Sequence, residues 1–247
     1  MERHRLRHAI MALALALSCG AASADEIVVF STPTLKGVIE DLRPAFEKES
    51  GHRVVPVYAA AAALERRIES GEAFDLAILL EPQFAALARS GRTAQSAKLA
   101  RAVAGVAVRS GAGEPRDFGT QAALRKAIVD ARVLAFAKDS ASGAYFASLF
   151  DRLGVPGEKR KLKAFPDPVA AVAAGEADFT VISIPNILGR PGIALGGTLP
   201  DSLQNVTVFW IAPNAQASHG AATSQLVSAL RSARASYARH GLEPLSP

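Results

Sequence analysis

Short apolar runs alternate along the chain with segments in which apolar residues recur every three or four positions. The first run, residues 27–30, is followed by a helical pattern that starts near Thr34 and stops before Gly51. Alternation of this kind is typical of βαβ units, so the chain is predicted to be an α/β protein. Other predicted strands are residues 54–58, 75–80, 103–108, 133–137, 179–183 and 206–212. Other predicted helices lie around residues 64–68, 84–87, 124–129, 143–153, 169–174 and 226–237.

Two of the strand-like runs, near residues 103 and 206, enclose a self-contained α/β set. We infer that the chain leaves one lobe near residue 105, builds a second lobe and returns near residue 206. The predicted fold has two lobes, each a mostly parallel sheet flanked by helices, joined by two crossing strands. Residues 25–104 and 206–247 would form lobe 1, and residues 105–205 would form lobe 2.

The first 24 residues have the features of a secretory signal peptide. Three arginines within residues 3–7 precede an apolar run over residues 9–17, which is shorter than the roughly 20 residues that cross a bilayer. Residues 22–24, Ala-Ser-Ala, form a small-x-small cleavage site. We therefore expect export to the periplasm and a mature chain that begins at Asp25. A lipoprotein acylated at Cys19 is the alternative, although the nearby leucine is one position away from its usual place in a lipobox.

Composition narrows the class of protein once residues 1–24 are set aside. Lys and Arg then number 25 against 22 Asp and Glu, so the net charge falls from +5 to +3. The one basic run, residues 159–163, follows a Gly-Val-Pro-Gly turn and is interpreted as a solvated turn and strand edge, not a nucleic-acid interface. The 49% hydrophobic content predicts a well-buried core, and cleavage would remove Cys19, the single cysteine. We expect a monomer that meets a membrane only through a partner.

Four loops at the carboxyl ends of predicted strands carry the candidate chemistry, because ligands of α/β proteins bind where such loops meet helix N-termini. Three loops are rich in hydroxyl groups, and free N–H groups at a helix start favour an anion. Thr34 and Ser142 are the best-placed side chains, although either residue could instead be a helix cap. The loops are residues 31–34, 58–61, 138–143 and 183–186. The predicted ligand-binding residues are Thr32, Thr34, Ala61, Ser140, Ser142, Gly143 and Ser183.

Groups suited to catalysis or metal binding are few. After residue 24 the histidines are His52, His219 and His240, all outside the four loops, which argues against a Ser-His-Asp site or a histidine metal site. We interpret them as surface residues. Lys138 and Asp139 lie in one loop, where they could abstract a proton or form an exposed ion pair; we favour the ion pair. The prediction is therefore no catalytic residue, no metal and no cofactor.

A series of short motifs runs across nearly the whole predicted mature chain. It includes Val29-Phe30 before a hydroxyl loop, the segment 64–71 before Phe74-Asp75-Leu76, and Ser142-Gly143-Ala144-Tyr145 after a strand. It continues with Gly175-Glu176-Ala177-Asp178, Leu199-Pro200-Asp201 and the segment 237–242. In order and spacing these motifs resemble the periplasmic molybdate-binding proteins of ABC importers, which have the type II solute-binding fold.

The resemblance implies that the chain captures a small oxyanion between its lobes and delivers it to an ABC permease. In that family neutral hydroxyls and backbone amides hold the anion, and preorganised dipoles suit this task. By position, Thr34 replaces the serine of the first loop. Ser142 falls beside the small residue whose amide contacts the anion.

Two departures from the family pattern leave the ligand open. Residues 59–63 are all alanine where the family has a serine run, so Ala61 offers only its amide, and Ser183 stands where the family has a ligand tyrosine. We therefore keep an alternative function, a periplasmic isomerase of a small polycarboxylate similar to aconitate isomerase, acting by proton transfer. The alanine loop and the pair Lys138-Asp139 would suit such a larger, carboxylate-bearing ligand.

Overall fold

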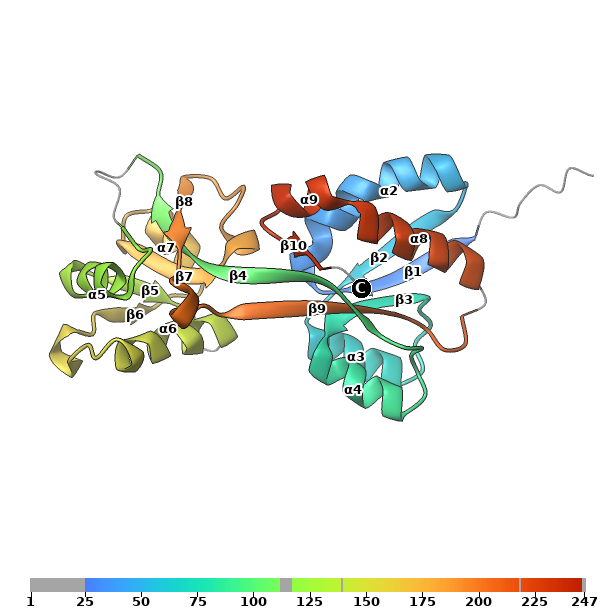
Figure 1. The fold of residues 1–247 in the computed structure, drawn as a ribbon, viewed down its shortest axis with the longest axis horizontal. Coiled ribbons are helices and arrows are strands. Elements are labelled where there is room, and N and C mark those ends of the chain that lie inside the picture. Colours follow the sequence, from blue (N-terminus) through green and yellow to red (C-terminus); the bar gives the residue numbers. More distant parts are fainter. Residues whose placement is uncertain (1–24, 112–116, 139, 218, 246–247) are drawn as a thin grey trace, which may run out of the picture.

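The computed structural model describes residues 25–111, 117–138, 140–217 and 219–245 of the chain. Figure 1 shows two lobes joined by two long strands that run side by side. The crossing strands are β4 (Ala97–Arg109) and β9 (Val206–Pro213), which pair with each other in antiparallel register. β4 then continues into the sheet of the second lobe, so one strand is shared by both lobes.

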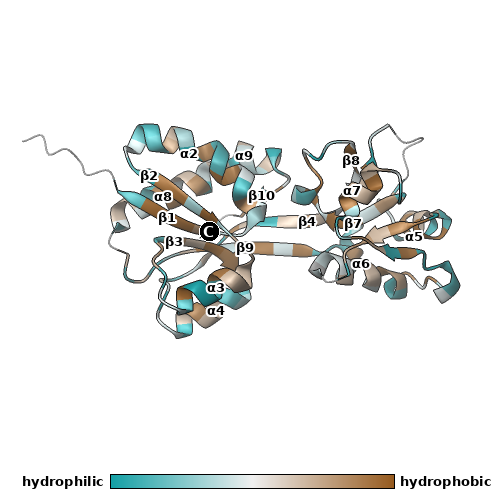
Figure 2. Ribbon diagram, turned by 180° about the vertical axis from the view of Figure 1, so that it is seen from behind, coloured by the Kyte–Doolittle hydropathy of each residue, from teal (hydrophilic) through white to brown (hydrophobic). Residues whose placement is uncertain are grey.

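The first lobe is a sheet with helices on both faces, in the strand order β2-β1-β3-β9-β4. Its further strands are β1 (Glu26–Ser31), β2 (Arg53–Tyr58), β3 (Leu76–Leu80) and β10 (Glu243–Pro244). Its helices are η1 (Pro33–Leu35), α2 (Lys36–Ser50), α3 (Ala61–Glu69), α4 (Glu81–Arg89), α8 (Gly220–Ser232) and α9 (Arg234–Arg239). Strand side chains alternate between faces, so Val29 packs under α2 and α8, whereas Phe30 packs under α3 and α4. The strands are mostly hydrophobic, and hydrophilic residues lie on the outer faces of the helices (Figure 2).

The second lobe is built on the far end of β4. Its strands are β5 (Leu134–Phe136), β6 (Leu162–Ala164), β7 (Phe179–Ser183) and β8 (Ile193–Thr198). Its helices are α5 (Gln121–Asp130), α6 (Ala141–Arg152), η2 (Gly157–Lys159), α7 (Pro168–Ala173), η3 (Ile184–Asn186) and η4 (Asp201–Leu203). Phe146, Phe150 and Phe179 are fully buried in its core, where the ring of Phe146 packs near the other two rings. The two lobes therefore have separate hydrophobic cores.

The sheets are mixed rather than mostly parallel, which corrects the predicted strand arrangement. β1 pairs in parallel with β2 and β3, and β5 pairs in parallel with β6 and β7. The crossing strands, however, run in opposite directions between the lobes. Their pairings with β3, β7, β8 and each other are therefore antiparallel.

Several stretches differ from the sequence-based assignment: β4 begins six residues earlier than predicted, and β8 and β10 were not predicted. β8 was not predicted, because the adjacent Gly196 and Gly197 weaken its strand pattern, and the strand is held instead by pairing with β4. The predicted final helix is divided into α8 and α9 at Ala233, whose ψ of 40° interrupts the helical backbone. The basic run, in contrast, does lie on η2 and the short edge strand β6.

The predicted signal peptide and Cys19 lie outside the described residues. No helix within the described part of the chain is both long and apolar enough to span a membrane. We expect intact-mass measurement of exported protein to give a chain that begins at Asp25, without a free thiol, because cleavage after Ala24 removes the single cysteine. A mass that includes a diacylglyceryl group on Cys19 would favour the lipoprotein alternative instead.

Candidate functional site

A cavity of about 310 Å³ lies between the lobes, and we call it the interlobe cavity. Its wall is made of residues from lobe 1, from lobe 2 and from both crossing strands. Five of the seven predicted ligand-binding residues line it: Thr32, Thr34, Ala61, Ser142 and Ser183. The described lining residues carry hydroxyl, amide and apolar side chains, and none of them is charged. Any charge on a ligand would therefore be met by neutral dipoles.

Thr32 follows β1 and has an unusual environment. The residue is only 7% exposed, and its hydroxyl oxygen is buried without a hydrogen-bond partner. Thr32 precedes η1, which leads directly into α2, but its side chain does not cap the helix. Buried hydroxyl groups in proteins are almost always hydrogen-bonded. Because Thr32 also lines the cavity, rotation of its side chain would offer this unpartnered hydroxyl to a ligand.

The start of α3 supplies the second polar element. Ala61 is the first residue of this nine-residue helix, and no side chain caps its N-terminus at Ala60. The first N–H groups of a helix have no partner within the helix, and the helix dipole makes this end favourable for negative charge. The alanine loop therefore presents backbone donors where side-chain hydroxyls are missing.

The start of α6 shows which residue is the cap. Ser140, not Ser142, occupies the N-cap position: its Oγ accepts a hydrogen bond from the backbone N–H of Gly143 at 3.0 Å and donates to the carbonyl of Ala137 at 3.0 Å. Thr34 lies inside η1 and is not an N-cap either. The capping alternative for Thr34 and Ser142 is therefore wrong. Ser140 and Gly143 bond to each other and are not among the lining residues of the cavity.

This arrangement sets the direction of the Ser142 hydroxyl. The Oγ atoms of Ser140 and Ser142 are 3.3 Å apart, and Ser140 gives its one proton to Ala137. Ser142 must therefore donate, either to Ser140 or to a ligand in the interlobe cavity. If the Ser142 side chain rotates, its hydroxyl can donate this hydrogen bond to a ligand instead of to Ser140.

Gly143 is required by packing. A Cβ atom at this position would lie 1.9 Å from the carbonyl oxygen of Ala137. We expect Gly143→Ala to lower the free energy of unfolding by about 1–3 kcal/mol or more, since the backbone must move to admit the methyl group. Gly157→Ala, where a Cβ meets no atom within 4 Å, is the control in the same urea denaturation measurement. Equal stability of the two variants would contradict this account of the α6 start.

Four polar lining residues were missed by sequence reasoning. Tyr145 lies one helical turn after Ser142, and its hydroxyl donates to the carbonyl of Leu203. Burial raises the pKa of Tyr145, so the phenol stays neutral. Asn186 lies on η3 three residues after Ser183, a spacing that could have indicated it. The other two, Asn205 and Thr207, come from the β9 end, which has no motif of its own.

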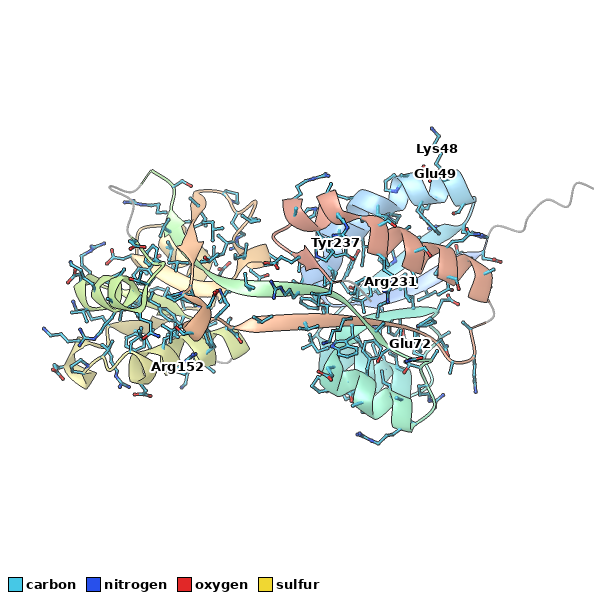
Figure 3. The ribbon with its side chains drawn as sticks, in the orientation of Figure 1. Lys48, Glu49, Glu72, Arg152, Arg231 and Tyr237 are labelled. Atoms are coloured by element: carbon cyan, nitrogen blue, oxygen red, sulfur yellow. The ribbon has the colours of Figure 1, made fainter. Side chains whose placement is uncertain are left out.

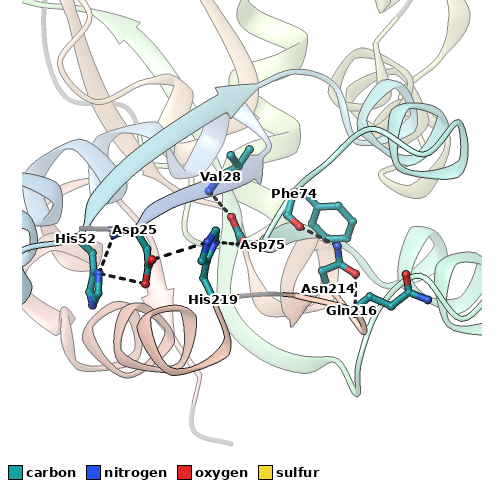
Figure 4. Close-up of polar contacts among 8 residues, drawn as sticks. All are labelled: Asp25, Val28, His52, Phe74, Asp75, Asn214, Gln216 and His219. Carbon is teal, nitrogen blue, oxygen red and sulfur yellow. Dashed lines mark hydrogen bonds and ion pairs between the residues drawn. The ribbon is translucent and has the colours of Figure 1, made fainter. Parts of the chain in front are cut away.

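His52 is largely buried, which corrects its interpretation as a surface residue, whereas His219 and His240 are about one-third exposed, at 35% and 33%. The His52 side chain is 14% exposed and its Nδ1 is 3.6 Å from Asp25, while His219 lies 3.2 Å from Asp75 and 3.8 Å from Asp25 (Figure 4). His240 likewise bonds a carboxylate, at 2.9 Å. None of the three lines the interlobe cavity.

Catalytic and metal-binding groups are scarce in the described site. Lys138 is exposed and does not line the interlobe cavity, and Asp139 is outside the described residues, so their predicted ion pair stays a prediction. Within the described ranges, no group of three or more His, Cys, Asp or Glu residues is placed to hold a metal ion.

A family model for bacterial extracellular solute-binding proteins matches residues 27–243. The chain belongs to this family. The predicted relationship to the periplasmic molybdate-binding proteins is thus confirmed at the level of family and fold, because solved structures of this kind share the architecture of this solute-binding protein.

Three relatives illustrate the range of this similarity. An aconitate isomerase from a Pseudomonas species is 29% identical over 232 residues, which cover 89% of this chain and 88% of the relative. The substrate-binding domain of a protein assigned as a molybdenum ABC transporter from Clostridium difficile matches with a TM-score of 0.72 and 17% identity, over 90% of this chain and 100% of that one. The tungstate-binding protein of Desulfovibrio alaskensis G20 matches with a TM-score of 0.67 and 15% identity, over 91% and 100%. At these identities the solved structures establish the fold alone, the type II periplasmic binding fold.

Proposed function

We propose that this solute-binding protein captures a small anion in the interlobe cavity and delivers it to an ABC permease from the periplasm. The observation that carries the proposal is a lining residue with an unpartnered hydroxyl, Thr32, in a cavity that Ser142 and the uncapped start of α3 also line. Hydrogen-bond donors at fixed positions stabilise negative charge without a charged partner, since their dipoles need little reorganisation. The predicted ligand residues Thr32, Thr34, Ala61, Ser142 and Ser183 would supply such donors.

The lobes would close on the ligand about the crossing strands. We propose the predicted division, with residues 25–104 and 206–247 in lobe 1 and residues 105–205 in lobe 2. Gln204 supports a hinge at this boundary, because its side-chain oxygen accepts from the backbone N–H of Ala104 at 2.7 Å and of Asn205 at 2.8 Å. Closure of two rigid lobes about a few residues is a common mechanism of ligand capture.

The ligand class follows from the lining and the volume. A cavity of about 310 Å³ lies at the lower end of the range for small-molecule sites, roughly 300–1,000 Å³. The likeness to molybdenum and tungstate proteins favours a tetrahedral oxyanion.

Because the alanine loop lacks hydroxyls, we expect molybdate to bind more weakly here than in a relative with serines at both loops.

An isomerase of a small polycarboxylate is the second candidate function, and the similarity to aconitate isomerase favours it. A proton transfer needs a base in reach of the substrate. The described lining residues include no carboxylate, lysine or histidine, and the only phenol, Tyr145, has a raised pKa. Capture without chemistry is therefore the function that the described site supports better.

The test has a binding step and a reaction step. A thermal-shift screen of molybdate, tungstate, sulfate, phosphate, citrate and aconitate finds ligands, because a specific ligand stabilises the native state by mass action. Calorimetry with the best anion should show weaker binding for Thr34→Val and Ser142→Ala. Incubation with cis- and trans-aconitate, followed by NMR, should show no interconversion. Interconversion would establish the isomerase, and loss of it in Asp139→Asn would identify the base.

A further inference from the structure

The 3-10 turn η3 faces the interlobe cavity on one side and lobe 1 on the other. Ser183, just before the turn, and Asn186, at its end, line the cavity. Between them, Ile184 is only 7% exposed although it belongs to no large core of lobe 2. Its backbone oxygen closes the turn by accepting from the N–H groups of Ile187 and Leu188, at 2.8 and 3.2 Å.

Two glycines from different parts of the chain contact the Ile184 side chain. A Cβ atom on Gly105, in crossing strand β4, would lie 2.8 Å from Cγ1 of Ile184. A Cβ atom on Gly241, in the turn after α9, would lie 2.6 Å from Cγ2 of Ile184 and 2.9 Å from Cδ1 of Leu188. The backbone at both positions therefore approaches Ile184 more closely than any side chain would permit. We call Gly105 and Gly241 the Ile184 seat.

The Gly241 half of the Ile184 seat is a contact between lobes. Gly241 precedes β10, which pairs with β4 inside the sheet of lobe 1, whereas Ile184 extends from β7 of lobe 2. The contact between Gly241 and Ile184 therefore joins the two lobes at a point away from the crossing strands β4 and β9. A β-branched side chain has few χ1 rotamers, so Ile184 cannot easily turn a methyl group away. The angle between the lobes and the position of η3 are then linked by van der Waals contact.

We propose that Gly105 and Gly241 seat Ile184 and so fix where η3 holds Ser183 and Asn186 relative to the lobe 1 half of the cavity. Ile184 and Gly241 are thus positioning residues, which act on a ligand only through their neighbours. The effect on binding rests on the proposed function, whereas the effect on lobe geometry does not. A side chain at position 241 would push η3 and lobe 2 outward.

Spin-label distances between the lobes test the geometry without any ligand. The mature chain predicted here contains no cysteine, so labels can be attached at Lys48→Cys, which points outward on α2 (Figure 3), and at Lys126→Cys on α5. Gly241→Ala should displace the mean distance, because the new methyl group must move about 1 Å to reach an ordinary contact of roughly 3.5 Å. Gly51→Ala is the matched control, since Gly51 has a similar positive φ of 75° but no atom within 4 Å of its Cβ position. It reproduces the backbone strain without the contact and should leave the distance unchanged.

A compensating variant separates the contact from a general loss of structure. Ile184→Ala added to Gly241→Ala removes the two γ carbons and should return the distance towards that of the parent chain. Should Gly241→Ala fail to fold, Ile184→Ala alone empties the Ile184 seat and should broaden the distance distribution. A distribution for either variant identical to those of the parent and of Gly51→Ala would overturn the proposal.

The effect on ligand binding is measured by calorimetry, with molybdate and trans-aconitate as probes. We expect Gly241→Ala to weaken binding of whichever probe the parent chain binds by about tenfold or more, the equivalent of one hydrogen bond to a charged group. Gly51→Ala should bind like the parent. If the parent chain binds neither probe, the proposed function fails for these anions, but the distance measurement still decides the role of the Ile184 seat. A displaced distance with unchanged affinity would refute the link to Ser183 and Asn186.

Discussion

Replacing Thr32 with valine is expected to weaken anion binding about ten- to a hundredfold while leaving the free protein as stable as before or more stable. Valine has the shape of threonine without the hydroxyl. In the free protein that hydroxyl is buried with no partner, so its loss breaks no bond and removes a desolvated polar group, worth roughly 0–2 kcal/mol of added stability. In the complex the same hydroxyl would be a donor to the anion, and its bond would be lost.

Thr223 provides the matched control for this prediction. It is 1% exposed, and its hydroxyl is also buried without a partner, but it lies on α8 and does not line the interlobe cavity. Thr223→Val should change stability in the same direction as Thr32→Val and leave affinity unaltered. The measurements are urea denaturation of the free proteins and calorimetry with the anion found by the screen. A destabilised Thr32→Val that still binds normally would show that the hydroxyl serves the fold and not a ligand.

The positions of strands and loops could be predicted because they depend on local periodicity. A run such as residues 27–30 is apolar since it is buried on both faces of a sheet, and the polar loop after it must lie at the sheet edge. Thr32 and Ser183 follow directly from this rule, as Thr32 comes immediately after β1, Ser183 is the last residue of β7, and both line the interlobe cavity. The antiparallel pairings of β4 and β9 could not be predicted in the same way, because strand direction within a sheet leaves no periodic signal.

Other parts of the site depend on contacts between distant segments. Asn205 and Thr207 line the interlobe cavity only because β9 passes between the lobes, and neither lies in a recognisable motif. Ser140 and Ser142 are both consistent with a helix start in sequence, and the choice of cap depends on the tight approach of Gly143 to Ala137. Local sequence therefore indicated the loops, whereas the assignment of individual hydroxyls needed the folded backbone.

Ser142→Asp is expected to weaken binding of an anion by roughly a thousandfold while preserving the fold. The described lining residues of the interlobe cavity are uncharged, so the introduced carboxylate would be the first charge that they place beside the ligand. Two like charges about 4 Å apart repel by about 4 kcal/mol at an effective dielectric constant of 20. Ser142 is the second residue of α6, where negative charge is favourable to the helix dipole by about 0.3–1 kcal/mol. Binding and stability should therefore change in opposite directions.

The sign of the Ser142→Asp effect also reports the charge of the ligand. Ala122→Asp is the matched control, because Ala122 is exposed, is likewise the second residue of its helix, α5, and does not line the interlobe cavity. It adds the same charge to lobe 2 and the same favourable interaction with a helix dipole, so it should bind the anion nearly as well as the parent chain. Calorimetry at two salt concentrations measures both variants, since screening weakens the distant charge more than the one within the cavity. Tighter binding by Ser142→Asp would mean that the cavity takes a cation, and equal binding by both variants would place the ligand outside the interlobe cavity.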